Sequence, residues 1–329
     1  MPMTPPETPS IRIAAVQFEP RDGDKGFNLE RIEALAGRAA REGARVVSFH
    51  ECSISGYSFV QTFDKQQMLD LAEEIPDGSA TRELIRIAGR HNIVVLAGLF
   101  EREGDEVFNS YVCVDGNGLV ARHRKLHTFV NPHLTPGSAF TVFDIDGWKC
   151  GILICYDNNL PEDVRCTALL GAEVIFMPHV TGCLPSVMPG RGVVDPALWE
   201  RRATDPVPLR MELNGPKGRG WLMRWLPARA WENGIYAVFT NPIGMEHGQV
   251  RNGNAMILDP FGEVQTECHA LGDDLCIGLC TREKLALSSG RRYLRARRPE
   301  LYGPLTAASD QPPVTEPGWR LAYRDRTSS

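Results

Sequence analysis

The chain has 329 residues, of which 43% are hydrophobic and 23% charged, and its net charge is −5. This composition supports a sizeable core and is not that of a disordered chain, and the length allows one large domain or two ordinary ones. No block of lysine and arginine precedes residue 291, so the sequence shows no sign of nucleic-acid binding. The basic segment Gly290–Pro299 is interpreted as a solvated or interface-covering tail.

The first ten residues are polar and rich in proline and lack the pattern of a secretory signal. The longest apolar run, Ile93–Phe100, is far shorter than the roughly 18 residues that a membrane span needs. We therefore expect a soluble, cytoplasmic protein. The nine cysteines include no Cys-x-x-Cys pair, so neither a zinc ribbon nor a redox dithiol is indicated, and most of these thiols are expected to be buried.

The predicted elements alternate between strand and helix at the start of the chain. Strands are predicted at residues 11–20, 44–51 and 93–100, and helices at 27–43 and 79–92. Two hairpins then follow at 106–125 and 140–155, and a later one surrounds the turn at 259–262. This order predicts an α/β fold with a mixed sheet, or with two sheets packed face to face and covered by helices.

Residues 183–220 do not fit this pattern, because they are rich in proline, glycine and arginine. We interpret them as a long inserted loop with one short helical turn that acts as a lid or pocket wall. Residues 221–234 are expected to form a helix that ends at Asn233-Gly234. The segment after about residue 303 is expected to be a tail that is loose or wraps around a neighbour.

Cys155 stands at the end of the apolar run in GILICYDNNLPED, residues 151–163. A strand followed by a polar turn and a helix places this residue at the carboxyl edge of a sheet, where α/β proteins put their sites. The helix is expected to begin near Pro161, so N–H groups of the turn could face a developing oxyanion. From this segment alone, Cys155 is either a nucleophile or one more small core residue.

Two other predicted strands end on charged residues. Glu51 follows the apolar run at 46–49, and it is either exposed at the sheet edge or buried at a cost of several kcal/mol. Arg124 and Lys125 face opposite sides of their strand, so one of them faces inward. Both Glu51 and Lys125 could equally be solvated strand-end residues. Acyl transfer from an amide, however, needs three groups together. They are a thiol that attacks, an acid that moves protons and an ammonium that stabilises the oxyanion.

At these residues the sequence resembles the nitrilase superfamily, the carbon–nitrogen hydrolases, over roughly residues 11–293. The motifs are FHECSISGY around Glu51, HRKLH around Lys125 and GILICYDNNLPEDVR around Cys155, and LPARAWENGIYAVFTNPIG resembles a downstream family segment. The resemblance implies that Glu51 is the general base, that Lys125 stabilises the oxyanion and that Cys155 is the nucleophile.

The resemblance also implies a four-layer α-β-β-α sandwich, made of two mixed sheets packed face to face. It implies a homodimer or a larger homo-oligomer, and it requires neither a metal nor an organic cofactor. The domain division expected on this basis is a disordered N-terminus at 1–10, the hydrolase domain at 11–293 and a C-terminal tail at 294–329.

Two positions depart from the family pattern. His50 stands where the family often has proline. Many members also carry a second glutamate between the lysine and the cysteine, whereas residues 126–154 contain none. Asn131 and His133 lie in that neighbourhood instead, and His133 is either a substitute for the acid or a structural histidine.

The residues after the cysteine bear on the substrate. Cys155-Tyr156-Asp157 resembles the amidase and carbamoylase branches, whereas nitrile-cleaving members more often show Cys-Trp-Glu. This resemblance predicts hydrolysis of an amide or an N-carbamoyl compound through a cysteine thioester, with release of ammonia or an amine. Tyr57, Tyr156 and Thr181 are the expected substrate-binding residues, because they lie beside the motifs.

Several alternatives stay open. Within the family, the chain could be a nitrilase or an acyltransferase. Outside it, a metal-binding protein could use His123, His127 and His133, although these residues do not have a known ligand spacing. A non-catalytic scaffold of the same fold is a further alternative, against which the complete set of acid, lysine and cysteine argues.

Overall fold

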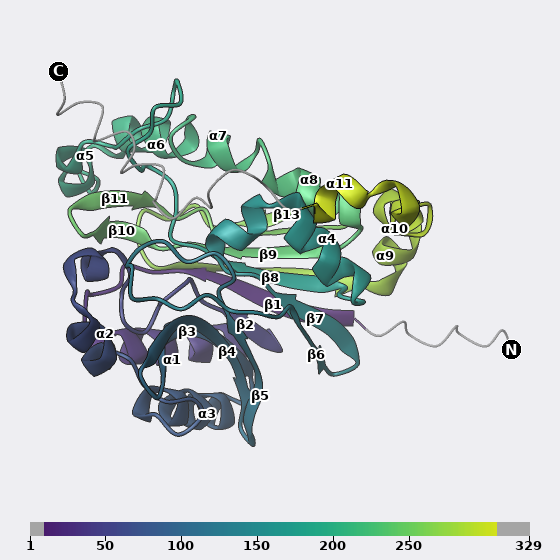
Figure 1. Cartoon of the computed structure of the whole chain (residues 1–329). Helices are drawn as coiled ribbons and strands as arrows, with labels where there is room; N and C mark the ends of the chain where they lie inside the picture. Colours follow the sequence, from purple (N-terminus) through teal and green to yellow (C-terminus); the bar gives the residue numbers. More distant parts are fainter. Residues whose placement is uncertain (1–9, 308–329) are drawn as a thin grey trace, which may run out of the picture.

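The computed structural model describes residues 10–307 and consists of two six-stranded mixed sheets that pack face to face (Figure 1). Helices cover the outer face of each sheet, so the predicted α-β-β-α sandwich is confirmed. In spatial order the first sheet contains β14 (Asp274–Thr281), β1 (Ser10–Gln17), β2 (Val46–Ser48), β3 (Val94–Glu103), β4 (Glu106–Asp115) and β5 (Gly118–Arg124). The second contains β13 (Val264–Glu267), β12 (Met256–Leu258), β9 (Tyr236–Thr240), β8 (Val174–Pro178), β7 (Trp148–Ile152) and β6 (Thr141–Ile145).

The three apolar layers follow from the alternation of side chains along the strands. In β1, Ile11 and Ile13 point into the core between the two sheets, and Ala14 and Val16 point to the helices on the other face. The outer face of the first sheet packs against α1 (Lys25–Arg41) and α3 (Ser79–His91). The outer face of the second packs against α4 (Pro161–Leu169) and α8 (Leu226–Asn233).

Local sequence signals fix the ends of several helices. The side chain of Asp24 accepts the N–H of Phe27 at the start of α1, as an N-cap residue does. The predicted start of a helix at Pro161 is confirmed, because α4 begins there. The predicted stop at Gly234 is confirmed as well, since this residue caps α8 in the left-handed conformation with φ 58°.

The inserted segment 183–220 is more ordered than its composition predicts. It contains the helices α5 (Pro196–Glu200) and α6 (Pro206–Asn214) and the start of α7 (Arg219–Leu222), so the prediction of a loop with one helical turn is wrong. The prolines that suggested a loop stand at the first positions of α5 and α6, where a fixed φ and a missing N–H cost nothing. The predicted helix at 221–234 also begins later, at Leu226.

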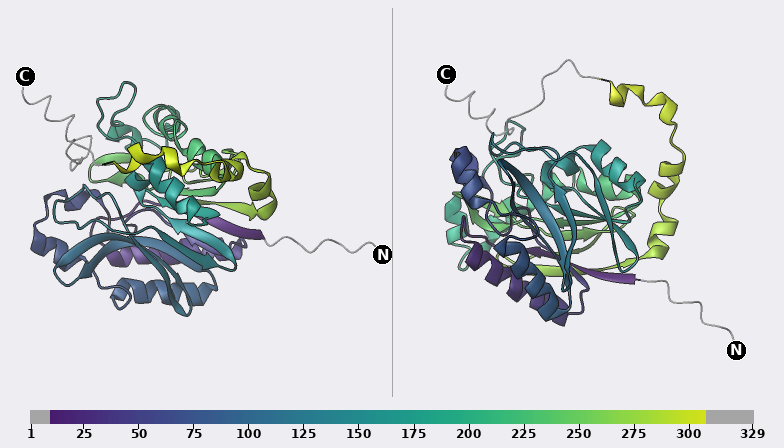
Figure 2. Two further views of the ribbon diagram at one scale, coloured as in Figure 1. Left: turned by 45° about the vertical axis from the view of Figure 1, so that its right-hand side comes forward. Right: turned by 60° about the horizontal axis from the view of Figure 1, so that its bottom comes forward.

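The remaining elements lie at the margins of the sandwich. They are η1 (Ser58–Thr62), α2 (Lys65–Leu71), the hairpin of β10 (Ile243–Glu246) and β11 (Gln249–Asn252), α9 (Arg282–Leu287), α10 (Ser289–Arg295), η3 (Pro299–Leu301) and α11 (Gly303–Thr306). The part from α9 to α11 runs along one side of the molecule (Figure 2). Within residues 10–307, no helix combines the length and the apolarity that a membrane crossing would need.

The basic segment Gly290–Pro299 is partly helical, because α10 covers its first half. There Arg291 donates to the carbonyl oxygens of Gly234 and Ala172, which anchors α10 to the body of the protein. The expected boundary between domain and tail, at residue 293, falls within this helix. Most of the expected disordered N-terminus, residues 1–9, and the end of the expected tail, residues 308–329, lie outside the described residues.

Gly98 of β3 allows the turn after β2 to lie directly on the sheet. The Gly98 carbonyl accepts the N–H of Ile54, and a Cβ at this glycine would lie 3.1 Å from the carbonyl carbon of Glu51 and would clash with the backbone N of Cys52. A side chain at residue 98 would therefore push away the segment that carries Glu51.

We expect Gly98→Ala to lower the free energy of unfolding by about 1–3 kcal/mol, because the added methyl overpacks this contact. Gly272→Ala is the matched control, since a Cβ there has no neighbour within 4 Å. Urea unfolding of both variants measures the difference. Equal stability of the two variants would contradict the close approach at Gly98.

Candidate active site

The three predicted catalytic residues follow three different strands and meet in one place. Glu51 lies in the turn after β2, Lys125 directly follows β5, and Cys155 opens η2 (Cys155–Asn159) after β7. Glu51 and Lys125 are each 1% exposed and Cys155 is 6% exposed. The structure thus places an acid, an ammonium and a thiol in the interior, at the ends of strands from both sheets.

Glu51 and Lys125 form a buried ion pair. Lys125 Nζ donates to Glu51 Oε1 over 2.6 Å, and Asn109 Nδ2 donates to the same oxygen over 2.7 Å. The backbone N–H of Val180 donates to Glu51 Oε2 over 3.1 Å. Burial alone would lower the pKa of Lys125, but the Glu51 carboxylate outweighs it and the pKa lies well above its ordinary value. The buried lysine is therefore held as the ammonium ion.

Cys155 lies beside this pair with its backbone in the left-handed region, at φ 51°. Its Sγ lies 3.9 Å from the carbonyl oxygen of Val180, the residue whose N–H contacts Glu51. Burial first, and then the negative charge of Glu51, raise the pKa of the Cys155 thiol to about 12. The resting sulfur is therefore a neutral thiol, and it needs a base before it can act as a nucleophile.

Aromatic groups complete the surroundings of Lys125. Its Nζ lies 3.5 Å from the hydroxyl oxygen of Tyr57 and 4.9 Å from the centre of the Phe129 ring. The pKa of Tyr57 is well above its ordinary value, chiefly because of burial, so its hydroxyl is neutral. A phenol and a ring face therefore contact the ammonium in addition to Glu51, and the ring contributes a cation–π attraction.

Neither Asn131 nor His133, the residues in the neighbourhood of the missing second glutamate, contacts Glu51, Lys125 or Cys155. Asn131 donates to the carbonyl oxygens of Val60 and Phe63 and so fixes the loop that follows η1. His133 is exposed, so the alternative in which it substitutes for the acid is wrong.

The three residues expected to bind substrate differ in their placement. Tyr57 is 6% exposed and touches Lys125. Tyr156 is 38% exposed, and its ring centre lies 5.5 Å from that of Phe129. Thr181 is half-buried, and its N–H donates to Asn241 Oδ1 over 2.9 Å. The structure therefore brings Tyr57 to the lysine, whereas the substrate contacts of all three stay predictions.

Sequence reasoning missed the contacts from Asn109, Phe129 and Val180. Asn109 is a buried polar residue on β4, in a stretch that is otherwise mostly apolar. This interruption is a signal that could have found it. Val180 acts through its backbone N–H and carbonyl, and such a contribution leaves no side-chain signature in the sequence.

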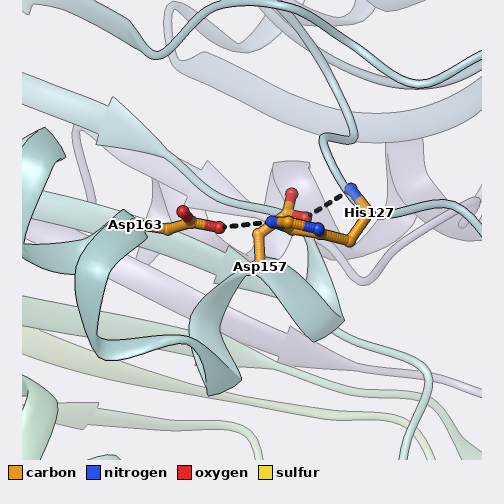
Figure 3. A group of neighbouring side chains, drawn as sticks. All are labelled: His127, Asp157 and Asp163. Atoms are coloured by element: carbon orange, nitrogen blue, oxygen red, sulfur yellow. Dashed lines mark hydrogen bonds and ion pairs between the residues drawn. The ribbon is translucent and has the colours of Figure 1, made fainter. Parts of the chain in front are cut away.

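Three residues near Glu51, Lys125 and Cys155 form a compact polar cluster (Figure 3). The possible ligand atoms of His127, Asp157 and Asp163 all lie within 4.8 Å of one another. His127 Nε2 lies 2.9 Å from Asp163 Oδ2, and the His127 backbone N–H donates to Asp157 Oδ1 over 2.9 Å. These two contacts link the three residues to one another, so the cluster is a hydrogen-bonded group.

The alternative metal site made of three histidines is not formed. His123 is buried, with Nδ1 lying 3.0 Å from Thr141 Oγ1, whereas His133 is exposed in the segment between β5 and β6. Among residues 10–307, the one cluster with three possible ligands contains His127 but neither of the other two histidines.

We expect Lys125→Ala to lower the free energy of unfolding by about 3–5 kcal/mol, because it leaves the buried Glu51 carboxylate without its counter-ion. The double variant Lys125→Ala with Glu51→Gln should lose less free energy of unfolding than the sum of the two single variants, since it leaves no unpaired carboxylate in the interior. Urea unfolding of the four proteins measures the coupling. Additive losses would contradict a coupled ion pair.

Sequence comparisons with known proteins give matches over most of the chain. The family described as carbon–nitrogen hydrolase matches residues 12–287. An (R)-stereoselective amidase from Pseudomonas sp is 31% identical over 307 residues, which cover 91% of this chain and 96% of the amidase. A nitrilase from Pyrococcus abyssi (strain GE5 / Orsay) is 30% identical over 257 residues, which cover 77% of this chain and 83% of the nitrilase.

Solved structures share the same fold. A structure of the amidase from Nesterenkonia sp. AN1, in which the acetamide moiety of fluoroacetamide is attached to the active-site cysteine, matches with a TM-score of 0.67 at 24% identity. The match covers 92% of this chain and 99% of the amidase. With the family match extending over most of the chain and the sandwich architecture in common, this protein belongs to the carbon–nitrogen hydrolases of the nitrilase superfamily.

Proposed function

We propose that this protein hydrolyses the C–N bond of a small amide or N-carbamoyl compound through a thioester on Cys155, with release of ammonia or an amine. The observation that supports this most directly is the arrangement of a neutral thiol beside the buried Glu51–Lys125 ion pair. A neutral thiol, a carboxylate and an ammonium are the groups that nucleophilic attack, proton transfer and oxyanion stabilisation each require.

In the first half of the reaction, Glu51 accepts the thiol proton as the Cys155 sulfur attacks the carbonyl carbon. The oxyanion that forms on the carbonyl oxygen is stabilised by the Lys125 ammonium. This ion is already fixed by Glu51 Oε1 and flanked by Tyr57 and Phe129, so little reorganisation is needed as charge develops. Glu51 then gives its proton to the leaving nitrogen, the C–N bond breaks and a thioester remains.

In the second half, a water molecule attacks the thioester carbon and Glu51 accepts its proton. The second tetrahedral intermediate collapses, the C–S bond breaks, and the sulfur recovers a proton from Glu51. The same carboxylate thus acts twice as base and twice as acid. The N–H bonds from Asn109 and Val180 keep both of its oxygens in place during the cycle.

Two features favour an amide or a carbamoyl group over a nitrile. The nucleophile is followed by Tyr156-Asp157, the pattern that resembles the amidase and carbamoylase branches. The relatives with the fuller coverage of this chain include the amidase from Pseudomonas sp and a citrullinase from Francisella tularensis subsp. tularensis, whereas the nitrilase from Pyrococcus abyssi covers less.

We expect the purified enzyme to release ammonia from a panel of carboxamides and N-carbamoyl amino acids, and not from the matched nitriles. Cys155→Ala should abolish this release and leave the folded structure unchanged, because Cys155 contributes the attacking sulfur. Ammonia is measured by a coupled assay and folding by circular dichroism.

The other outcomes of this panel separate the alternatives. Ammonia release from nitriles but not from amides would identify a nitrilase and contradict the proposal. Faster transfer of the acyl group to hydroxylamine than to water, detected as a hydroxamate, would identify an acyltransferase. Undiminished activity in Cys155→Ala would exclude a thioester on this residue.

We also propose a homodimer or a larger homo-oligomer. Two large aromatic side chains stand exposed next to each other, since Trp231 of α8 is 45% exposed, Tyr293 of α10 is 41% exposed and their ring centres lie 5.4 Å apart. Exposed apolar groups that gather in this way are typical of protein–protein interfaces.

We expect light scattering to give at least twice the mass of one chain, 36.5 kDa. Trp231→Glu should shift the protein toward single chains, because it places a charge in the apolar contact. A monomer at micromolar concentration would contradict this assembly.

A further inference from the structure

The carboxylate of Asp157 joins the segment of the nucleophile to the segment of the lysine. Its Oδ2 accepts the backbone N–H of Ile154 over 3.1 Å and that of Leu126 over 3.2 Å. Its Oδ1 accepts the backbone N–H of His127 over 2.9 Å (Figure 3). Ile154 directly precedes Cys155, the nucleophile of the proposed reaction, and the other two donors directly follow Lys125.

This side chain has no contact with solvent, since Asp157 is 0% exposed. A buried carboxylate is costly unless several donors compensate it, and here all three bonds come from backbone N–H groups. Such bonds leave little freedom to either segment. If the carboxylate moved, the turn before the nucleophile or the loop after the lysine would have to move with it.

The turn that carries Cys155 needs this support because its backbone is strained at φ 51°. A non-glycine residue in a sparsely populated backbone region costs on the order of 1–3 kcal/mol and persists only where its surroundings fix it. Arg229 of α8 contributes from the other side of η2, donating to the carbonyl oxygens of Asn158 and Asn159. Arg229 bonds the nucleophile's turn but not the segment of Lys125, whereas Asp157 bonds both segments.

From these contacts we infer that Asp157 is a positioning residue that fixes Lys125 relative to Cys155. It does not touch the reacting atoms. Its three bonds set the spacing between the ammonium that stabilises the oxyanion and the sulfur that attacks. The effect on turnover rests on the proposed function, while the effect on the sulfur itself does not.

The test compares Asp157→Asn with the matched control Asp163→Asn. The amide that Asp157→Asn introduces would turn an N–H donor toward backbone N–H groups and would break at least one of the three bonds. Asp163→Asn weakens the side-chain contact to His127 but leaves all three backbone bonds in place. Both variants remove one carboxylate from the same cluster, but only Asp157→Asn breaks bonds that join the two segments. The Asp157 charge also acts on Lys125, and Asp157→Glu, which keeps that charge, separates this effect from the loss of the link.

Two readouts separate positioning from general stability. The first is kcat divided by the concentration of titrated active sites. These sites are counted as Cys155 alkylated by iodoacetamide, and peptide mass spectrometry separates this residue from the half-buried Cys166. We expect Asp157→Asn to lower this kcat by about 100-fold, as a displacement of about 1 Å does, with little change in KM. The second is the rate of Cys155 alkylation, which should also fall. Asp163→Asn should stay close to the wild type in both readouts.

The inference is overturned if Asp157→Asn lowers only the unfolding midpoint, while kcat per titrated site and the alkylation rate match those of Asp163→Asn. Should Asp157→Asn not fold, Asp157→Glu replaces it, because it keeps the charge and lengthens the arm by one methylene. A wild-type kcat and alkylation rate in Asp157→Glu would equally overturn it. If the wild type hydrolyses no member of the panel, the proposed function fails, while slower alkylation in Asp157→Asn would still support the positioning role.

Discussion

The buried ion pair between Glu51 and Lys125 is the interaction on which the site depends. Removing two charges from water costs several kcal/mol for each ion, and their attraction compensates this only when the geometry is good and the remaining hydrogen-bonding positions are filled. Here Nζ lies 2.6 Å from the carboxylate, Asn109 and Val180 donate to its oxygens, and a phenol and an aromatic ring flank the ammonium. The fold therefore has to bring all of these groups together in one place.

The two sheets bring these groups together because their strand ends meet across the central core. Glu51 and Lys125 follow strands of the first sheet, while Cys155 and Val180 follow strands of the second. The packing between the sheets therefore determines the distance from acid to thiol. The same packing buries the sulfur, and this burial together with the charge of Glu51 raises the pKa of Cys155 to about 12.

The lack of a second glutamate between Lys125 and Cys155 changes the electrostatics of this arrangement. Glu51 is the carboxylate that bonds the ammonium directly, and beside a neutral thiol the two charges of this ion pair balance within the buried contact. Tyr57 and Phe129 surround the lysine without adding a charge. A second carboxylate without hydrogen-bond donors would be costly to bury beside this ion pair. Uncharged aromatic groups around Lys125 are therefore consistent with a site that lacks the second glutamate.

The sequence by itself determined the family and fold class, the strand ends that carry Glu51, Lys125 and Cys155, and the helix boundaries at Pro161 and Gly234. These features depend on local patterns, in which apolar alternation, proline and glycine act over a few residues. The helices within 183–220 were missed because proline favours both loops and the first turn of a helix. Only the tertiary structure decided the contacts of Asn109, Phe129 and Val180, the exclusion of His133 and the link through Asp157. Each of these depends on which strand ends meet across two sheets, and a backbone N–H that binds a carboxylate has no residue type by which the sequence could reveal it.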